Sequence, residues 1–496
     1  MLAADICERA LEARDARFDG LFFVGITSTG VYCRPVCPAR VSYSSHRRFF
    51  DSAAAAECAG FRPCLRCRPE LAPGRAVCDA VSRLAGLAAR RIAGGALNGR
   101  SVAELAGDLG VSERHLRRAL EREIGVPPIE LAQTHRLLLA KQLLGDTSLS
   151  VTRIAYASGF QSLRRFNSVF RDRYGLNPSA ARRARRGRDA RVPAIVAAAI
   201  PGRDLVRLTL AYRAPLAWDV LLACLQRDAM PEVETIEAGS YMRTVRLDGR
   251  NGVIMARDAG ADDRDRRRSA RTHLDVALSS NLLPVLMPLL ARLRQVFDLD
   301  AEPLVIDSHL ERTGLGALVR RRPGLRIPGA LDGFEVALRS VLGGSRMNLT
   351  RVVRDLGEPI ETGVATLTRL APTAARIADA GALHLSRLGV APRLADAITA
   401  IAAAVVDGTL VLEPGSDVVT TCAALMDVGG ISKSLATAIA MRTLLWPDSF
   451  PVSDRALERA AGASSASDLR ARAEKWRPWR AYAALHLRLH AQDIAV

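Results

Sequence analysis

Hydrophobic residues recur at helical spacing between residue 78 and about residue 185. Ser101 and Ser112 each precede one such segment, in the place that a helix-capping serine occupies. This order predicts two short helices joined by a turn, which is the helix-turn-helix arrangement. The same order returns further along, where Ser162 begins the second helix of another unit, and the pattern over 128–144 predicts a long helix between the two units.

The pattern changes between residues 205 and 300, where hydrophobic and polar positions alternate as they do in half-buried strands. The strand-like runs are 206–210, 241–247 and 273–278. Helical spacing over 218–228 and 282–297 separates them, so we expect a small α+β domain. From residue 301 to residue 496 the spacing is helical again.

Length and charge narrow the class of protein. A chain of 496 residues is too long for one hydrophobic core and indicates about three or four domains. The formal net charge of +18 and the pI near 10.4 favour a polyanionic partner such as nucleic acid. An arginine-rich composition with only three lysines also gives solvated basic surfaces, so charge alone does not decide between the two explanations.

Four cysteines give the strongest chemical signal in the chain. Cys33 and Cys37 form one close pair, and Cys64 and Cys67 form another. Two such pairs supply the four soft ligands that Zn²⁺ binds in a tetrahedron, at about 2.3 Å from each sulfur. A domain this small buries little apolar surface, so the metal would contribute directly to its folding. On spacing alone, a purely structural zinc site explains the pattern.

The other cysteines and the hydrophobic runs indicate where in the cell the protein resides. The chain has nine cysteines, an odd number, and those outside the quartet show no paired spacing, which is typical of a reducing compartment. Acidic residues near the start disfavour a signal peptide. The runs at 192–200 and 282–290 are too short to span a bilayer. We expect a cytoplasmic protein without a membrane role.

The segments 22–35 and 60–69 closely resemble the N-terminal domain of Ada-type DNA repair proteins. The resemblance implies that Cys33, the first cysteine of the C-R-P-x-C run, is both a zinc ligand and a methyl acceptor, and that Cys37, Cys64 and Cys67 complete the ligand set. The implied substrate is a DNA methylphosphotriester. Irreversible methylation would lower the negative charge of the zinc site and strengthen DNA binding.

The tandem helix-turn-helix resembles the AraC-type DNA-binding domain, including the closing segment 170–178. Arginine, glutamine and asparagine pair with base edges in the major groove, while other arginines of such a surface contact only phosphate. The candidate DNA-reading residues of the two second helices are Arg114, His115, Arg117, Arg118, Gln161, Arg164, Arg165 and Asn167. The basic run at 182–188 is expected to be a flexible linker that adds non-specific affinity for DNA.

The hairpin at 425–434, followed by the segment 450–455, resembles the helix-hairpin-helix DNA glycosylases, and the whole block resembles their 3-methyladenine DNA glycosylase II, or AlkA-type, branch. The resemblance implies a hairpin that binds a DNA phosphate and a catalytic carboxylate that acts on a flipped-out base. The phosphate-binding residues would be Gly430, Ser432 and Lys433, and the carboxylate would be Asp454. Lyase-type relatives carry a lysine where this chain has Ser434, so a monofunctional hydrolase is expected.

The chain departs from this branch where the damaged base should bind. Relatives stack cationic bases on aromatic rings, but residues 335–445 contain no Phe, Trp or Tyr. The positions of the pocket aromatics are occupied here by Ser434, Ala438, Arg455 and Arg488. The bulky residue that replaces the flipped base is also missing from the segment 342–345. Two interpretations stay open, an active glycosylase with an altered pocket and a catalytically inert remnant.

The sequence therefore predicts a multidomain, mainly α protein that responds to DNA alkylation. We expect five segments: a small four-cysteine zinc α+β domain at 1–75, a tandem helix-turn-helix domain at 78–185, a basic linker at 186–204, a small α+β domain at 205–300 and an all-α helix-hairpin-helix glycosylase domain at 301–496. The expected partners are one Zn²⁺ ion, double-stranded DNA and RNA polymerase. The alternative is a transcriptional regulator with structural zinc and an inert C-terminal half. No Pro-Cys-His-Arg run is present, so transfer from O6-methylguanine is not expected.

Overall fold

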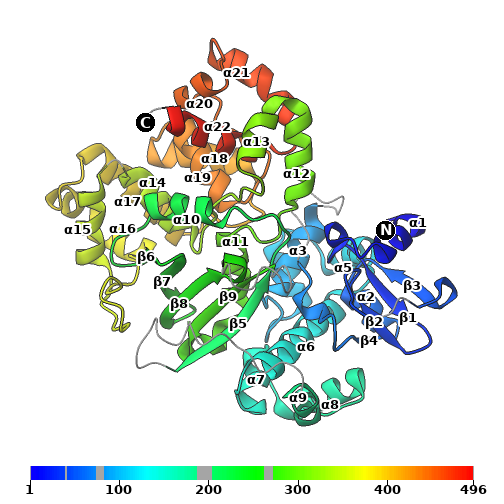
Figure 1. Ribbon diagram of the computed structural model, residues 1–496. Helices are drawn as coiled ribbons and strands as arrows, with labels where there is room; N and C mark the ends of the chain where they lie inside the picture. Colours follow the sequence, from blue (N-terminus) through cyan, green and yellow to red (C-terminus); the bar gives the residue numbers. More distant parts are fainter. Residues whose placement is uncertain are drawn as a thin grey trace. The chain divides into compact units, whose positions relative to one another are not determined.

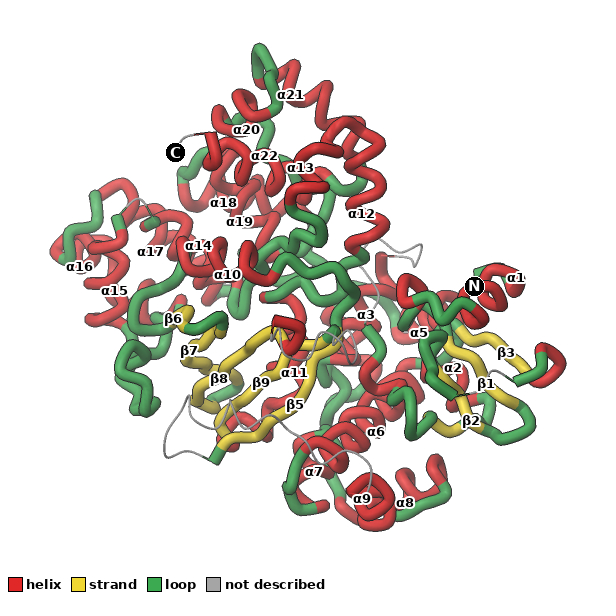
Figure 2. The backbone as a smooth tube through the Cα atoms, viewed as in Figure 1, coloured by secondary structure: helices red, strands yellow, loops and turns green. Residues whose placement is uncertain are grey.

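The computed structural model describes residues 2–39, 42–73, 83–186, 204–261, 272–343 and 345–494. The chain divides into two compact units. The first unit contains Met1–Ala199, Asp204–Arg213 and Ala259–Arg292, and the second contains Ile200–Arg203, Ala214–Asp258 and Leu293–Val496. Most of the described residues outside the two sheets are helical (Figures 1 and 2). No helix in this described part of the chain is both long and apolar enough to cross a membrane.

The first unit begins with a small four-stranded sheet of order β3-β1-β2-β4. β1 pairs antiparallel with β2 and β3, and β2 pairs parallel with β4. Phe23 of β1 and Tyr32 of β2 are buried and in edge-to-face contact at 5.8 Å, and Phe22, just before β1, is buried in a separate cluster. The elements are α1 (Ala4–Glu12), β1 (Phe23–Ile26), β2 (Val31–Cys33), β3 (Arg47–Phe50), α2 (Ala53–Cys58) and β4 (Arg62–Pro63).

The two helix-turn-helix units follow, and the predicted serine caps are present. Ser101 forms a reciprocal capping box with Glu104, while Ser112 and Ser162 accept hydrogen bonds from backbone N–H groups of the helices that they begin. Phe166 is fully buried, as the hydrophobic pattern indicated. The helices are α3 (Arg83–Ala93), α4 (Val102–Asp108), α5 (Glu113–Ile124), α6 (Pro128–Asp146), α7 (Val151–Ala157), α8 (Leu163–Tyr174) and α9 (Pro178–Arg186).

One expectation for this region is wrong. The basic run at 182–188 was expected to be a linker, but its first five residues, Arg182–Arg186, form the end of helix α9. The reason lies just upstream: the Asn177 side chain accepts a hydrogen bond from the Ala180 N–H at 2.7 Å, and Pro178 occupies the first helical position. Nearly all of the expected 186–204 linker lies outside the described residues.

The second sheet has the order β5-β9-β8-β7-β6, with β5 and β9 assigned to the first unit and the other strands to the second. The three expected strands are present as β5 (Leu205–Ala211), β7 (Ser240–Leu247) and β9 (His273–Ser279), and the structure adds β6 (Glu234–Glu237) and β8 (Arg250–Asp258). The helix expected over 282–297 begins instead as a 3-10 helix, Ser280–Val285, because Pro284 and Pro288 restrict its first turns. It continues as α11 (Leu286–Val296).

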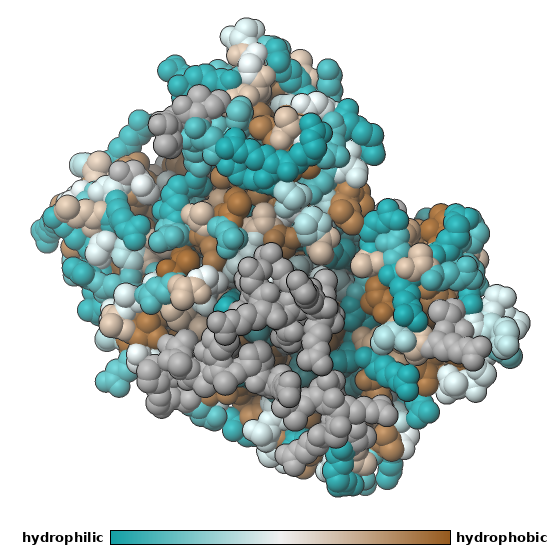
Figure 3. All heavy atoms as spheres, in the orientation of Figure 1, coloured by the Kyte–Doolittle hydropathy of each residue, from teal (hydrophilic) through white to brown (hydrophobic). Residues whose placement is uncertain are grey.

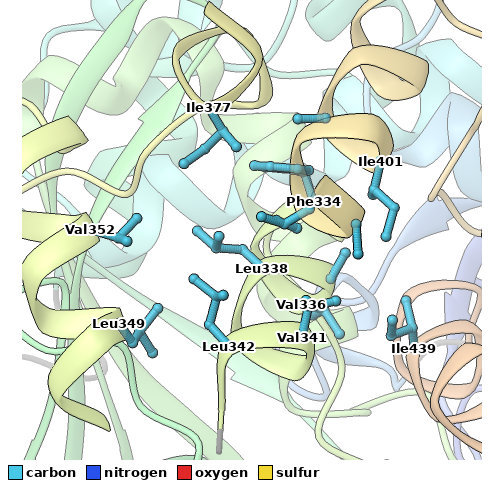
Figure 4. Packing of buried hydrophobic residues seen from close by; sticks show 14 of the residues in the cluster. Phe334, Val336, Leu338, Val341, Leu342, Leu349, Val352, Ile377, Ile401 and Ile439 are labelled. Carbon is cyan, nitrogen blue, oxygen red and sulfur yellow. The ribbon is translucent and has the colours of Figure 1, made fainter. Parts of the chain in front are cut away.

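The hydrophobic core of the second unit is built around helix α14. Figure 4 shows Phe334, Leu338 and Leu342 of α14 pointing toward side chains of the neighbouring helices, among them Val352, Ile377 and Ile401. All of these side chains are buried. The helices of this unit are α10 (Trp218–Arg227), α12 (Pro303–Leu310), α13 (Gly316–Arg321), α14 (Gly333–Leu342), α15 (Arg346–Leu356), α16 (Ala374–Arg387), α17 (Pro392–Val406), α18 (Val418–Gly429), α19 (Lys433–Thr443), α20 (Arg455–Ala460), α21 (Ala466–Ala473) and α22 (Arg480–Ile494).

Candidate functional site

The four cysteines of the quartet meet at one point. The sulfur atoms of Cys33, Cys37, Cys64 and Cys67 all lie within 4.8 Å of one another. A Zn²⁺ ion bound to four thiolates requires sulfurs about 3.8 Å apart, the edge of a tetrahedron with bonds of about 2.3 Å. Among the described residues this is the one group of His, Cys, Asp and Glu side chains that could hold a metal ion.

Two strand ends bring the pairs together. Cys33 ends β2, and the Cys64 N–H, just after β4, donates a hydrogen bond to the Tyr32 carbonyl oxygen at 2.9 Å. This bond aligns the start of the second pair with the strand that carries the first. Backbone N–H groups also donate to the sulfurs: Arg34 to Cys67 Sγ and Arg66 to Cys64 Sγ, both at 3.3 Å. Such bonds stabilise thiolate charge, so the donor set fits a bound cation.

Without a cation these sulfurs compete for protons. Hydrogen bonding with Cys37, with further contributions from the other two cysteines and from burial, raises the pKa of the Cys33 thiol. Four buried thiols therefore cannot all ionise by themselves, and a divalent cation would remove this conflict. The chemistry of the donors thus also favours a bound divalent cation at this site.

Cys33 faces a cavity of about 490 Å³ in the first unit. Cys33, Cys37 and Cys64 line it together with apolar side chains that include Val24 and Leu144, whereas Cys67 is not part of the lining. Cys33 itself is 8% exposed. The sulfur of Cys33 is thus held within the fold, at the wall of a mainly apolar hollow large enough for a small group.

The candidate DNA-reading residues are all exposed. They lie on α5 and α8 or, in the case of Gln161, just before the cap of α8, with Leu116 and Phe166 buried on the opposite faces. Arg117 forms an ion pair with Glu113, one turn earlier, at 2.6 Å. The exposed positions are Arg114, His115, Arg117, Arg118, Gln161, Arg164, Arg165 and Asn167. Their contacts with DNA remain a prediction.

The expected hairpin joins α18 to α19. Gly430 ends α18 in the left-handed region with φ 55°, and the Ser432 side chain caps α19 by accepting a hydrogen bond from the Leu435 N–H at 3.3 Å. Gly430, Ser432 and Lys433 are all exposed. The turn therefore presents small residues and one cation to solvent, the surface that close approach of a DNA phosphate requires.

Asp454 has two sets of partners. Its Oδ1 accepts hydrogen bonds from the backbone N–H groups of Ala456 at 2.9 Å and Leu457 at 3.4 Å, so it caps helix α20. Its Oδ2 accepts a hydrogen bond from Arg488 Nη2 of α22 at 2.9 Å. The two side chains are 20% and 31% exposed. The carboxylate is fixed in position on both sides and still reaches solvent.

The aromatic residues around this part of the second unit are not exposed. Phe450, Trp476, Trp479 and Tyr482 are all buried, and they contact one another in pairs within the fold. Among the described residues of this unit, no aromatic side chain is classed as exposed. On the face drawn in Figure 3, hydrophilic residues gather over α13 and α21. The described part of the second unit thus presents no exposed aromatic platform for a base.

Sequence reasoning missed two charged partners. Arg488 was noted only as a residue that stands where relatives place an aromatic, and its bond to Asp454 joins segments 34 residues apart. Lys141, which approaches the metal cluster from α6, was read only as one of three lysines. No local pattern marks either contact, because each depends on how helices pack.

Comparison with known proteins finds three family models that match successive parts of the chain. The model described as "Metal binding domain of Ada" matches residues 6–70, a helix-turn-helix domain matches 105–184, and the "AlkA N-terminal domain" matches 207–332. Together with the cysteine cluster, the first match confirms the expected zinc cofactor, one ion in a site of four cysteines. The mainly helical, multidomain fold class is also confirmed.

Individual relatives extend the match to almost the whole chain. A probable bifunctional transcriptional activator/DNA repair enzyme AlkA of Mycobacterium tuberculosis is 35% identical over 492 residues, 97% of this chain and 95% of the relative. DNA-3-methyladenine glycosylase 2 of Escherichia coli is 31% identical over 285 residues, 56% of this chain and 95% of the relative. Among solved structures, a 3-methyladenine DNA-glycosylase from Archaeoglobus fulgidus is 18% identical and covers 58% of this chain and 99% of its own, with a TM-score of 0.47. The chain therefore belongs to the family of bifunctional transcriptional activators and DNA repair enzymes of the AlkA type, with an Ada-type zinc domain at its start.

Proposed function

We propose that this protein removes methyl groups from DNA methylphosphotriesters onto Cys33, activates transcription in response, and excises alkylated purines by N-glycosidic hydrolysis. The observation that carries the proposal is the set of four converging cysteine sulfurs, three of which, including that of Cys33, line a cavity. A purely structural zinc site does not require a cavity beside a ligand. The family relatives, named as activators and repair enzymes, support the same assignment.

The methyl transfer depends on the sulfur of Cys33. Bound zinc keeps the four thiols deprotonated at neutral pH. The lone pair of Cys33 Sγ forms the new S–CH₃ bond, the methyl–oxygen bond of the triester breaks, and the electron pair remains on the phosphate oxygen, which regains its negative charge. The product on Cys33 is a thioether, so the transfer is irreversible.

The charge of the cysteine site changes in the same step. Four thiolates and one divalent cation carry a net charge of −2, and conversion of one thiolate to a thioether leaves −1. Repulsion between the site and the DNA backbone falls, so the methylated protein should bind its promoter more tightly. The exposed residues of α5 and α8 would read that promoter, and RNA polymerase would be the partner that the bound activator recruits.

Mass spectrometry tests the transfer directly. Zinc-loaded protein is incubated with duplex DNA that carries methylphosphotriesters, and Cys33 is expected to gain about 14 Da, one methyl group in place of a proton, in stoichiometric yield. Cys33→Ser should gain nothing, and Cys58→Ser, which alters an exposed cysteine outside the cluster, should behave like the wild type. An unmodified Cys33 in zinc-loaded protein would instead identify a plain regulator with structural zinc.

The second activity would depend on Asp454. The carboxylate can stabilise positive charge that develops on the deoxyribose and can orient the attacking water after the base leaves the stack. Support comes from its fixed position and its access to solvent. The exposed hairpin residues Gly430, Ser432 and Lys433 would bind the phosphate backbone on the same unit.

A base-release assay on alkylated duplex DNA tests this half separately. The wild type should release 3-methyladenine or another damaged purine, and Asp454→Asn should release none. Methyl transfer to Cys33 without release of any base would show that the C-terminal half is inert, the alternative that the missing aromatics favour. Zinc-bound thiolates and a DNA substrate suit the reducing cytoplasm, where we propose that the protein acts.

A further inference from the structure

The ion pair between Arg488 and Asp454 places a permanent positive charge beside the candidate catalytic carboxylate. Arg488 Nη2 lies 2.9 Å from Asp454 Oδ2 and approaches from a different helix, α22. The guanidinium of an arginine carries a positive charge, and its planar group has several N–H donors. One of these donors is bound to Asp454, and the side chain, 31% exposed, still reaches solvent.

A cation at this position changes which bases the site attracts. Arg455, the residue after Asp454, is exposed. Asp454 therefore has one arginine next to it in the sequence, Arg455, and one bonded to it in the fold, Arg488. Asp454 offsets only one of these two positive charges, so a base that carries a positive charge is disfavoured at this site. No exposed aromatic ring is present among the described residues of the unit to offset that repulsion by cation–π attraction.

An uncharged base should instead be helped to leave by a nearby arginine. When the glycosidic bond of a neutral purine breaks, the bonding electrons stay on the base nitrogen, and the departing base becomes an anion. A guanidinium within hydrogen-bonding reach stabilises that developing charge. A purine with a ring carbonyl also offers an acceptor to the remaining N–H groups of the guanidinium.

We propose that Arg488 is a specificity-determining residue which shifts the preference of this site, relative to cationic N-methylated bases, toward uncharged purine lesions that carry a carbonyl, such as deaminated purines. The inference rests on the proposed role of Asp454. The bond from C1′ to the base nitrogen breaks, and water forms the new bond to C1′. One proton of that water passes by way of Asp454 to solvent, and the base anion, held by Arg488, takes a proton from solvent.

The test compares two duplex oligonucleotides, one with a single hypoxanthine and one with a single 7-methylguanine. Single-turnover rates of base release are measured for the wild type and for Arg488→Met, which keeps the length of the side chain without its charge. Because 7-methylguanine leaves more readily by itself, the informative quantity is the hypoxanthine to 7-methylguanine rate ratio, compared between proteins. This comparison cancels the intrinsic reactivity of each base.

Arg488→Met should lower that ratio by about tenfold or more, the effect of one hydrogen bond to a charged group. Arg488→Trp, which supplies an aromatic face, should lower it further, whereas Arg488→Lys should retain most of the preference. Arg459→Met removes an exposed arginine from α20 and should leave the ratio unchanged. Unfolding curves for each variant separate a change in preference from a loss of fold.

If the hypoxanthine to 7-methylguanine rate ratio changes less than tenfold in Arg488→Met, the inference about Arg488 is overturned. Release of a base by the wild type would still be consistent with the proposed role of Asp454. Release of neither base by the wild type has a different meaning, because it overturns the proposed glycosylase activity and the inference with it. A ratio that falls equally in Arg488→Lys also counts against the proposal, since the charge would then not be its cause.

Discussion

The ammonium group of Lys141 donates a hydrogen bond of 3.3 Å to the carbonyl oxygen of Cys64, a member of the metal cluster. The same ammonium forms an ion pair with Glu70 Oε2 at 2.5 Å, and the two side chains are only 6% and 1% exposed. Burial acts to raise the pKa of Glu70, but the charges of Lys141 and Arg68 outweigh it and lower that pKa. Lys141 lies on α6, so the helix between the two helix-turn-helix units is bonded directly to the backbone of a candidate metal ligand.

We expect Lys141→Met to destabilise the first unit and to accelerate loss of zinc. The substitution keeps the apolar stem but leaves the buried Glu70 carboxylate with Arg68, 3.1 Å away, as its remaining cation. Breaking a buried ion pair costs about 3–5 kcal/mol when the remaining charge has no partner, so the loss here should lie below that range. Zinc release to a colorimetric chelator and hydrogen exchange of the α6 amides report the effect. Lys475→Met is the matched control, because Lys475 is exposed in the second unit. Wild-type zinc release in Lys141→Met would show that the bond to Cys64 does not stabilise the metal site.

Removal of zinc should unfold part of the first unit and leave the second unit intact. All four cysteine ligands belong to the first unit, whereas the four tryptophans of the chain, Trp218, Trp446, Trp476 and Trp479, all belong to the second. Intrinsic tryptophan fluorescence therefore reports on the second unit alone within the intact protein. A strong chelator should reduce the circular dichroism signal of the zinc domain without shifting the fluorescence-detected unfolding midpoint. A shift of that midpoint would show that the two units unfold together.

Local chemistry explains which features could be predicted from the sequence. The cysteine quartet, the serine caps and the Gly430 turn each depend on residues close together in the chain, and the structure contains all of them. The edge strand Glu234–Glu237 escaped prediction because its residues are mostly polar. Strand Arg250–Asp258 was missed because its buried residues form a continuous run instead of alternating.

Long-range contacts account for the rest. Nothing near Asp454 in the sequence indicates Arg488, and nothing near Cys64 indicates Lys141, since both partners arrive on distant helices. The basic run at 182–188 was misread for a different reason. Its composition suggested a linker, but Asn177 and Pro178 begin a helix just before it, and that helix continues through Arg186. Charge pattern alone therefore predicts neither the ends of helices nor their ionic partners.

His486 should make the second unit less stable in acid. Burial, and to a lesser extent the charge of Arg322, lowers the pKa of His486 from its usual 6.5 to about 4. As the pH falls below 6.5 the unfolded chain takes up a proton while the folded chain does not, so the free energy of unfolding declines until the pH reaches about 4. The shift corresponds to a loss of about 3 kcal/mol over that interval.

His486→Leu should remove this dependence. The side chain is 2% exposed and its Nε2 atom has no hydrogen-bond partner among the residues that the structure describes, so leucine should be accommodated with little loss at neutral pH. Urea unfolding followed by tryptophan fluorescence at about pH 7.5 and about pH 5 measures the difference. His384→Leu, which alters a half-buried histidine of the same unit that contacts Asp355, should keep the wild-type difference. An unchanged acid sensitivity in His486→Leu would assign it to other groups.

The double role of Asp454, as cap of α20 and as candidate catalytic carboxylate, can be separated by two substitutions. Asn caps a helix about as well as Asp, whereas Ala does not, and loss of a cap costs about 1 kcal/mol. The partly exposed bond to Arg488 contributes at most about 1 kcal/mol in either variant. Asp454→Asn should therefore lose base excision while nearly keeping the fluorescence-detected stability, and Asp454→Ala should lose both.

A cap elsewhere in the same unit provides the control for these variants. Ser465 caps α21 through its bond from the Asp468 N–H at 3.1 Å, and Ser465→Ala should lower stability about as much as Asp454→Ala while retaining excision. Excision that survives in Asp454→Asn would mean that another group supplies the negative charge. Ser465→Ala and Asp454→Ala share only the loss of a helix cap. If Ser465→Ala loses excision as fully as Asp454→Ala does, then stability, and not the carboxylate, limits the reaction.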